Sequence, residues 1–75
     1  MNWQNFIEIT PGVRGGKPCL VGTRITPADV LEYLAGGMTE NDILQDFPSV
    51  TREHIRAVLA YAAERERHFA VYSAA

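Results

Sequence analysis

The sequence has few of the features on which secreted and membrane proteins depend. Its 75 residues include a single cysteine, Cys19, which has no partner for a disulfide within the chain. No stretch approaches the roughly 20 apolar residues of a membrane-spanning helix. Residues 1–10 lack both the basic start and the apolar run of a signal peptide. These absences lead us to expect a cytoplasmic protein, because thiols stay reduced in that compartment.

Groups that could perform catalysis or bind a metal are equally scarce. His54 and His68 have no companions at metal-ligand spacing, and Cys19 lies in an apolar segment that favours a buried, inert thiol. No Ser-His-Asp or Cys-His set can be proposed. The glycine-rich segment 12–18 does not fit a phosphate-binding loop, because Pro18 stands where serine or threonine is needed. We expect no enzyme activity, no metal and no cofactor.

Positive charge is also in short supply. The formal net charge is −2, and it is unevenly distributed. Residues 1–28 contain three basic residues and one acid, a charge of +2, whereas residues 29–75 contain four arginines and eight acids, a charge of −4. A protein that binds nucleic acid gains most of its affinity from phosphate neutralisation. The chain lacks the uniformly basic surface that such binding favours.

Glycines and prolines punctuate one continuous domain, residues 1–75, rather than separating several. A β-hairpin region is expected over residues 1–25, where residues 6–9 alternate like a half-buried strand. Segments 19–21 and 24–25 flank Gly22-Thr23, a pair typical of a two-residue hairpin turn because glycine readily adopts positive φ. We therefore expect these two segments to pair with each other.

Residues 26–75 are predicted to form three helices and a C-terminal tail. Thr26, Thr39 and Thr51 each follow an apolar residue and precede another four positions later, which is typical of an N-cap with a hydrophobic staple. The first helix should end at Gly36-Gly37, and the second before Pro48. The short connections indicate a mainly α fold, a trihelical helix-turn-helix bundle preceded by a short N-terminal β-hairpin. Its expected core residues are Val30, Leu31, Leu34, Ile43, Leu44, Phe47, Ile55, Val58, Leu59 and Ala62.

The start of the third helix is a candidate nucleic-acid interface. In a helix-turn-helix pair, the first residues of the second helix face the bases. Thr51 begins this helix, and Arg52 and Arg56 lie one turn apart on its outer face, where they could bind guanines or phosphates. Lys17 and Arg24 of the hairpin are also candidate nucleic-acid-binding residues, because a β-ribbon can enter a DNA groove. The alternative is that these cations are ordinary solvated charges, and acids on the second helix would repel DNA.

The tail and the hairpin loop form a candidate surface for a protein partner. Residues 60–75 continue the third helix beyond the reach of the first two, so the apolar side chains there need a partner or a second copy. The alternative is that they fold back on Trp3 and Phe6, or fray. The candidate partner-binding residues are Arg14, Arg65, Phe69, Val71 and Tyr72.

Several short motifs, in a fixed order, resemble a known family. They are Pro11-Gly12-Val13, Gly15-Gly16-Lys17-Pro18, Gly22-Thr23-Arg24-Ile25, Leu34-Ala35-Gly36-Gly37, Ile43-Leu44, Phe47-Pro48, Ile55-Arg56 and Leu59-Ala60-Tyr61-Ala62. The stretch from Ile9 to about Arg65 is similar to the domain of unknown function 433. The resemblance implies a homeodomain-like helix-turn-helix fold. For many members it also implies an antitoxin role beside a PIN-like ribonuclease toxin, with repression of the shared operon.

The sequence and the resemblance together predict a prokaryotic antitoxin-like protein that neutralises a PIN-like toxin and regulates its operon through DNA. Two other functions stay open: a stand-alone helix-turn-helix transcriptional regulator, and a homodimeric scaffold. The expected partners are the toxin, operator DNA and a second copy of the chain, as a homodimer or a larger hetero-oligomer.

Overall fold

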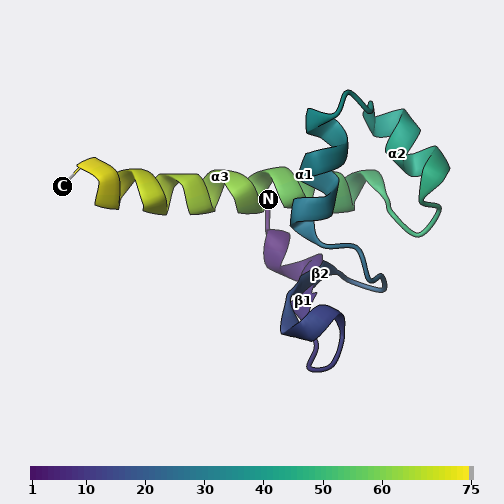
Figure 1. Ribbon diagram of the computed structural model, residues 1–75, viewed down its shortest axis with the longest axis horizontal. Coiled ribbons are helices and arrows are strands. Elements are labelled where there is room, and N and C mark those ends of the chain that lie inside the picture. The colour runs from purple at the N-terminus through teal and green to yellow at the C-terminus, as the bar shows by residue number, and fades with distance from the viewer. Residues whose placement is uncertain (75) are drawn as a thin grey trace.

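A computed structural model describes residues 1–74, with side chains described for residues 1–68. A short β-hairpin lies against a bundle of three helices, the last of which is much the longest (Figure 1). This arrangement confirms the predicted fold class. In chain order the elements are the 3₁₀ turn η1 (Trp3–Asn5), strand β1 (Ile7–Ile9), the 3₁₀ turn η2 (Arg14–Gly16), strand β2 (Pro18–Leu20), and helices α1 (Pro27–Ala35), α2 (Glu40–Asp46) and α3 (Arg52–Ala74).

The hairpin pairs different strands from those predicted. β1 runs antiparallel to β2, with Ile7 opposite Leu20, and η2 lies in the loop between them. Of the expected pairing of segments 19–21 and 24–25, one backbone hydrogen bond forms, from the Leu20 N–H to the Ile25 carbonyl at 2.8 Å, but residues 24–25 form no strand. Gly22, at φ 81°, lies in a tight turn closed by the Thr23 N–H, which donates to the Leu20 carbonyl at 2.9 Å. The chain enters the cap of α1 directly after this turn, so too few residues remain for a strand.

The first two helices begin as predicted, with a threonine at the N-cap. Thr26 Oγ1 accepts from the Asp29 N–H at 3.0 Å, and Asp29 Oδ2 accepts from the Thr26 N–H at 3.0 Å. Thr39 and Asp42 form the same reciprocal pair in α2, at 3.1 and 2.9 Å. Each pair satisfies two backbone donors that a helix start otherwise leaves without partners.

The third helix is also capped by a threonine, but its third residue, which completes the cap, is a histidine where the first two helices have an aspartate. Thr51 Oγ1 accepts from the His54 N–H at 3.2 Å, and His54 Nδ1 accepts from the Thr51 N–H at 3.0 Å. The other ring nitrogen, Nε2, lies 3.1 Å from the Val21 carbonyl oxygen. Because Nδ1 accepts, the proton lies on Nε2, which donates to Val21. His54 is buried and ties the end of the hairpin to the start of α3.

The core lies where the hairpin and the three helices meet. Leu59, which we predicted to be buried, is 48% exposed, whereas Ala57 is fully buried. The reason is helical phase: the inward face of α3 is centred near the buried Ala57 and Val58, and Leu59, about 100° beyond Val58 around the helix, lies at the edge of that face. The buried core residues are Ile7, Leu20, Val30, Ile43, Val50, Ile55, Ala57 and Val58.

Both capping aspartates have a lowered pKa. Burial acts to raise the pKa of Asp29, but hydrogen bonds from Thr26 and the positive charge of Arg14 outweigh it, so the pKa lies below its ordinary value of 3.8. Hydrogen bonds from the backbone and side chain of Thr39 lower the pKa of Asp42. In each case the helix start binds the ionised carboxylate more favourably than the protonated acid.

Folding stability is therefore expected to fall in acid. A depressed folded-state pKa contributes stability that is fully present above the unfolded pKa, about 3.9 for aspartate. That contribution is lost as the pH falls through the lower folded-state values. Urea denaturation between pH 7 and pH 2.5 should show a smaller acid-induced loss for the double variant Asp29→Asn and Asp42→Asn than for the natural chain. Equal losses in the two proteins would contradict this role of the caps.

Candidate functional site

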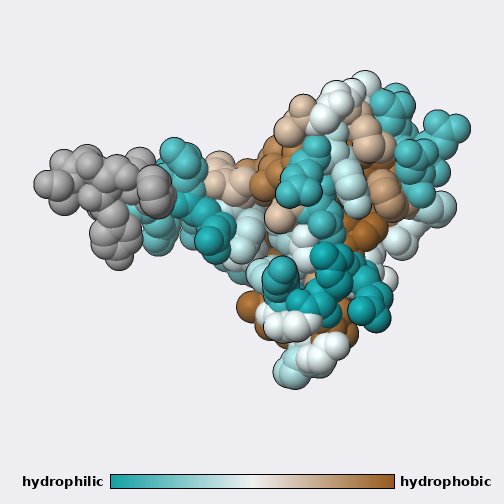
Figure 2. All heavy atoms as spheres, viewed as in Figure 1, coloured by the Kyte–Doolittle hydropathy of each residue, from teal (hydrophilic) through white to brown (hydrophobic). Residues whose placement is uncertain are grey.

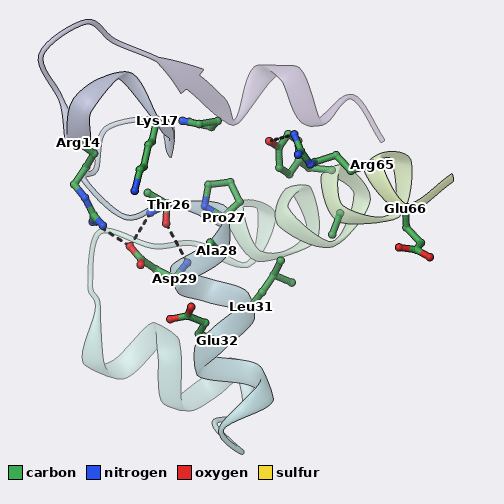
Figure 3. A pocket seen from close by; sticks show the side chains of 13 residues that line it. Arg14, Lys17, Thr26, Pro27, Ala28, Asp29, Leu31, Glu32, Arg65 and Glu66 are labelled. Carbon is green, nitrogen blue, oxygen red and sulfur yellow. Dashed lines mark hydrogen bonds and ion pairs between the residues drawn. The ribbon is translucent and has the colours of Figure 1, made fainter. Parts of the chain in front are cut away.

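A groove lies between the hairpin loop, α1 and α3 (Figure 3). Its volume is about 720 Å³, which is within the range of binding sites for small ligands and peptide side chains. Its apolar floor consists of Pro18, Pro27, Ala28, Leu31, Tyr61 and Ala62. Its charged rim consists of Arg14, Lys17, Asp29, Glu32, Arg65 and Glu66, and Thr26 completes the lining. The groove thus brings together three of the predicted site residues, Arg14, Lys17 and Arg65.

Arg14 closes one end of the groove through contacts within the chain. Its Nη1 donates to Asp29 Oδ2 at 3.1 Å (Figure 3). The same nitrogen donates to the Arg24 carbonyl at 2.9 Å. Its backbone has φ 49°, a left-handed conformation that is uncommon for a residue other than glycine. These contacts fasten the hairpin loop to the first turn of α1. Arg14, predicted to bind a partner, is therefore already paired inside the molecule.

Tyr61 and Arg65 form the opposite wall. The Arg65 guanidinium lies 5.5 Å from the centre of the Tyr61 ring, and its Nη1 donates to the Tyr61 hydroxyl at 3.2 Å. Trp3 packs edge-on against the same ring, with centroids 5.0 Å apart, and its Nε1 donates to Glu64 Oε2. A cation on one aromatic ring and a second ring at its edge are each favourable contacts. They hold this wall in place before any partner arrives.

The N-terminal segment covers only the beginning of the predicted tail. Trp3 reaches Tyr61 and Glu64, in agreement with the alternative in which the tail meets this part of the chain. The backbone of α3 continues to Ala74. The side chains of the three remaining predicted partner-binding residues, Phe69, Val71 and Tyr72, lie outside those that the structure describes.

The predicted nucleic-acid residues are divided between two parts of the chain. Thr51 caps α3. Arg52 Nη2 donates to Asn41 Oδ1 at 2.5 Å, and its Nη1 lies 3.8 Å from Glu40 Oε1, so this guanidinium is engaged by the start of α2. Arg56 is exposed on α3. Lys17 and Arg24 are exposed on the hairpin side. The structure therefore leaves one exposed arginine without a described partner at the start of α3.

The described part of the chain offers no group of three or more His, Cys, Asp or Glu residues that could hold a metal ion. α3 is 23 residues long, but neither it nor another helix in this part contains an apolar stretch that could cross a membrane. Cys19 is buried and forms no disulfide, and its Sγ lies 3.6 Å from the Lys17 carbonyl oxygen.

Comparison with known proteins agrees with the motifs and the fold. The model of a family described as protein of unknown function (DUF433) matches residues 7–62. The chain belongs to this family. It is similar to a DUF433 member protein from Anabaena variabilis whose crystal structure is known, with 30% identity and a TM-score of 0.77 over 96% of this chain and 71% of that one.

A curated relative of this DUF433 chain is the uncharacterized protein y4eO of Sinorhizobium fredii. The two are 32% identical over 59 residues, which make up 79% of this chain and 27% of the relative. The chain thus spans about a quarter of the length of this relative. The family match covers the hairpin, α1 and the Tyr61 side of the groove, whereas Arg65 and Glu66 lie beyond it.

Two features of the structure, the groove and the role of His54, were not predicted from the sequence. The groove was missed because its walls come from residues 14–32 and 61–66, which are distant in the chain. His54 was examined only as a metal ligand, although it occupies the N3 position after Thr51, where glutamate or glutamine completes a capping box. That position was the available signal for its structural role.

Proposed function

We propose that this protein is a cytoplasmic antitoxin-like binding module that neutralises a PIN-like ribonuclease toxin and, within that complex, regulates its operon. The observation that carries the proposal is the preformed groove between the hairpin, α1 and α3. Its floor is apolar, and its Tyr61 and Arg65 wall is ordered by contacts within the chain. A concave apolar surface with a few fixed polar groups is the usual form of a binding site.

The shape of α3 supports a protein partner. Its C-terminal half projects away from the hairpin and from the other two helices (Figure 1). A projecting helix next to a groove can extend along a partner while the groove holds one of the partner's side chains. A small domain thereby gains a larger interface than its globular part alone could offer. We propose that Arg65, Phe69, Val71 and Tyr72 contribute to that interface.

Electrostatics favour protein over DNA as the main partner. On the helix-turn-helix side, Arg52 is paired with Glu40, and α2 also carries Asp42 and Asp46. A phosphate backbone that approached this side would meet these acids as well as the exposed Arg56. DNA binding, in this proposal, is secondary and requires the assembled complex.

The proposed function is tested by co-expressing the chain with the protein encoded beside it. We expect the two proteins to copurify, and the toxicity of the partner to be relieved. Replacing Phe69 and Tyr72 together by serine should weaken the complex by about tenfold or more, the loss expected when aromatic interface anchors are removed. The matched control is Ser73→Ala, which changes a residue next to Tyr72 without removing an aromatic ring. The absence of both a stable complex and any relief of toxicity would overturn the proposal.

A stand-alone transcriptional regulator is the second candidate, and the short connection between α2 and the exposed start of α3 favours it. If α3 reads DNA directly, Arg52→Ala or Arg56→Ala should each weaken operator binding by about 1–3 kcal/mol when the arginine contacts a guanine. Gel-shift titration with the chain's own promoter measures this loss. Promoter binding that is unchanged in both variants would exclude this docking mode.

A further inference from the structure

The groove is lined by two cations on opposite walls. Lys17 descends from the hairpin loop on the Thr26 side, Arg65 lies on the Tyr61 ring, and Glu66 points away (Figure 3). Arg14 already has its counter-charge in Asp29. Among the side chains that the structure describes, none forms an ion pair with Lys17 or Arg65. Glu32, on the α1 side, has no ion pair with a described side chain either, so the groove presents two positive charges and one negative charge above an apolar floor.

We infer that the groove binds an acidic segment of a protein partner, with one apolar side chain on the floor and flanking carboxylates on Lys17 and Arg65. The inference rests on the proposed function and specifies the chemistry of the bound segment. The apolar anchor packs on Pro18, Pro27 and Leu31, where it is removed from water. The two cations select acidic neighbours and steer them toward the groove.

A nucleic acid fits the same groove poorly. One face of Tyr61 is covered by the Arg65 guanidinium, and Trp3 packs at the ring, so Tyr61 offers no free platform for a base. Asp29 and Glu32 lie on the α1 side of the groove and would repel a continuous run of phosphates.

The sharpest variant is Ala28→Glu. Ala28 lines the groove and is exposed, and it lies in the first turn of α1. A glutamate there is favourable to the helix dipole, so the fold should be retained, while the new carboxylate occupies the groove and competes for its cations. The matched control is Ala63→Glu, the same substitution at an exposed position of α3 outside the groove.

The direct test titrates the isolated chain with two synthetic peptides and follows backbone amides by NMR. One peptide is acetyl-Asp-Glu-Leu-Phe-Glu-Asp-amide, and the other has lysine at every acidic position. We expect the acidic peptide to shift the amides of Lys17, Ala28 and Arg65, with a dissociation constant about tenfold or more higher for Ala28→Glu than for Ala63→Glu. Equal shifts with both peptides, shifts elsewhere, or no shifts would overturn the inference.

The co-expressed partner separates this inference from the proposed function. If the natural chain forms the complex and Ala28→Glu weakens it much more than Ala63→Glu does, the groove is the docking site. If both variants bind the partner as well as the natural chain does, the groove inference is wrong and the proposed function stands. If no complex forms while the acidic peptide still binds the groove, the proposed function is wrong and the groove chemistry stands.

Discussion

Replacing Ile55 by alanine is expected to lower the free energy of unfolding by about 2–5 kcal/mol, the range for an aliphatic side chain truncated in a packed core. Ile55 is fully buried at the point where α3 meets the rest of the core. At the usual value of about 0.05–0.15 kcal/mol per residue, a 75-residue domain has a stability of about 4–11 kcal/mol, so this loss removes a large fraction of it. Urea denaturation followed by circular dichroism measures the change.

Leu59 provides the matched control for Ile55, one turn further along α3. Because Leu59 is 48% exposed, Leu59→Ala should cost less than about 1 kcal/mol, as surface substitutions usually do. The pair tests the phase of the helix as well as the core. If Leu59→Ala destabilised the protein as much as Ile55→Ala, the orientation of α3 described above would be wrong.

Replacing the buried His54 by alanine is expected to cost about 1–3 kcal/mol, because two backbone groups each lose a hydrogen bond worth about 0.5–1.5 kcal/mol. The Thr51 N–H loses its acceptor, and the Val21 carbonyl loses its donor. The edge contact between His54 and Phe6, with ring centroids 6.2 Å apart, is also lost. Both the start of α3 and its link to the hairpin should loosen. Thermal or urea denaturation at pH 7.5 measures the loss.

Comparison with Thr51→Ala separates the contribution of His54 to the cap of α3 from its link to the Val21 carbonyl. That variant removes the threonine side chain of the cap, a loss typically worth about 1 kcal/mol, but leaves His54 Nε2 on the Val21 carbonyl. We therefore expect His54→Ala to be clearly more destabilising than Thr51→Ala. Equal losses would show that the link to Val21 contributes nothing to stability.

Local signals predicted the helices well. The threonine caps depend on side chains within three residues of each other, and Thr26 and Thr39 each form the expected capping contacts with the residue three positions later. The short connections between the helices then indicated that consecutive helices pack directly on one another. These features could be predicted because a helix start depends on contacts that the sequence places next to one another.

Non-local choices were harder to predict. Segment 19–21 had two possible partners, and hydropathy alone did not show that residues 7–9 would pair with it in preference to residues 24–25. Leu59 was assigned to the core because it follows Ile55 and Val58 at helical spacing, but the inward face is centred near Ala57 and leaves Leu59 at its edge. The groove could not be predicted, since it exists only when the hairpin loop and α3 meet across α1.

The surface of the molecule carries both hydrophilic and apolar residues on the face drawn in Figure 2. Hydrophilic residues gather over the lower centre of the molecule and along α3, with apolar residues exposed between them (Figure 2). A mixed surface of this kind suits a partner that presents both charge and an apolar side chain.

Amide hydrogen exchange in the presence and absence of the co-expressed partner tests the central claim most directly. The claim is that the groove and the projecting helix, rather than the helix-turn-helix face, bind the partner. We predict that partner binding slows exchange in residues 14–18, 27–32 and 61–74, since a bound surface opens less often. Protection confined to residues 40–56, at α2 and the start of α3, would contradict the account.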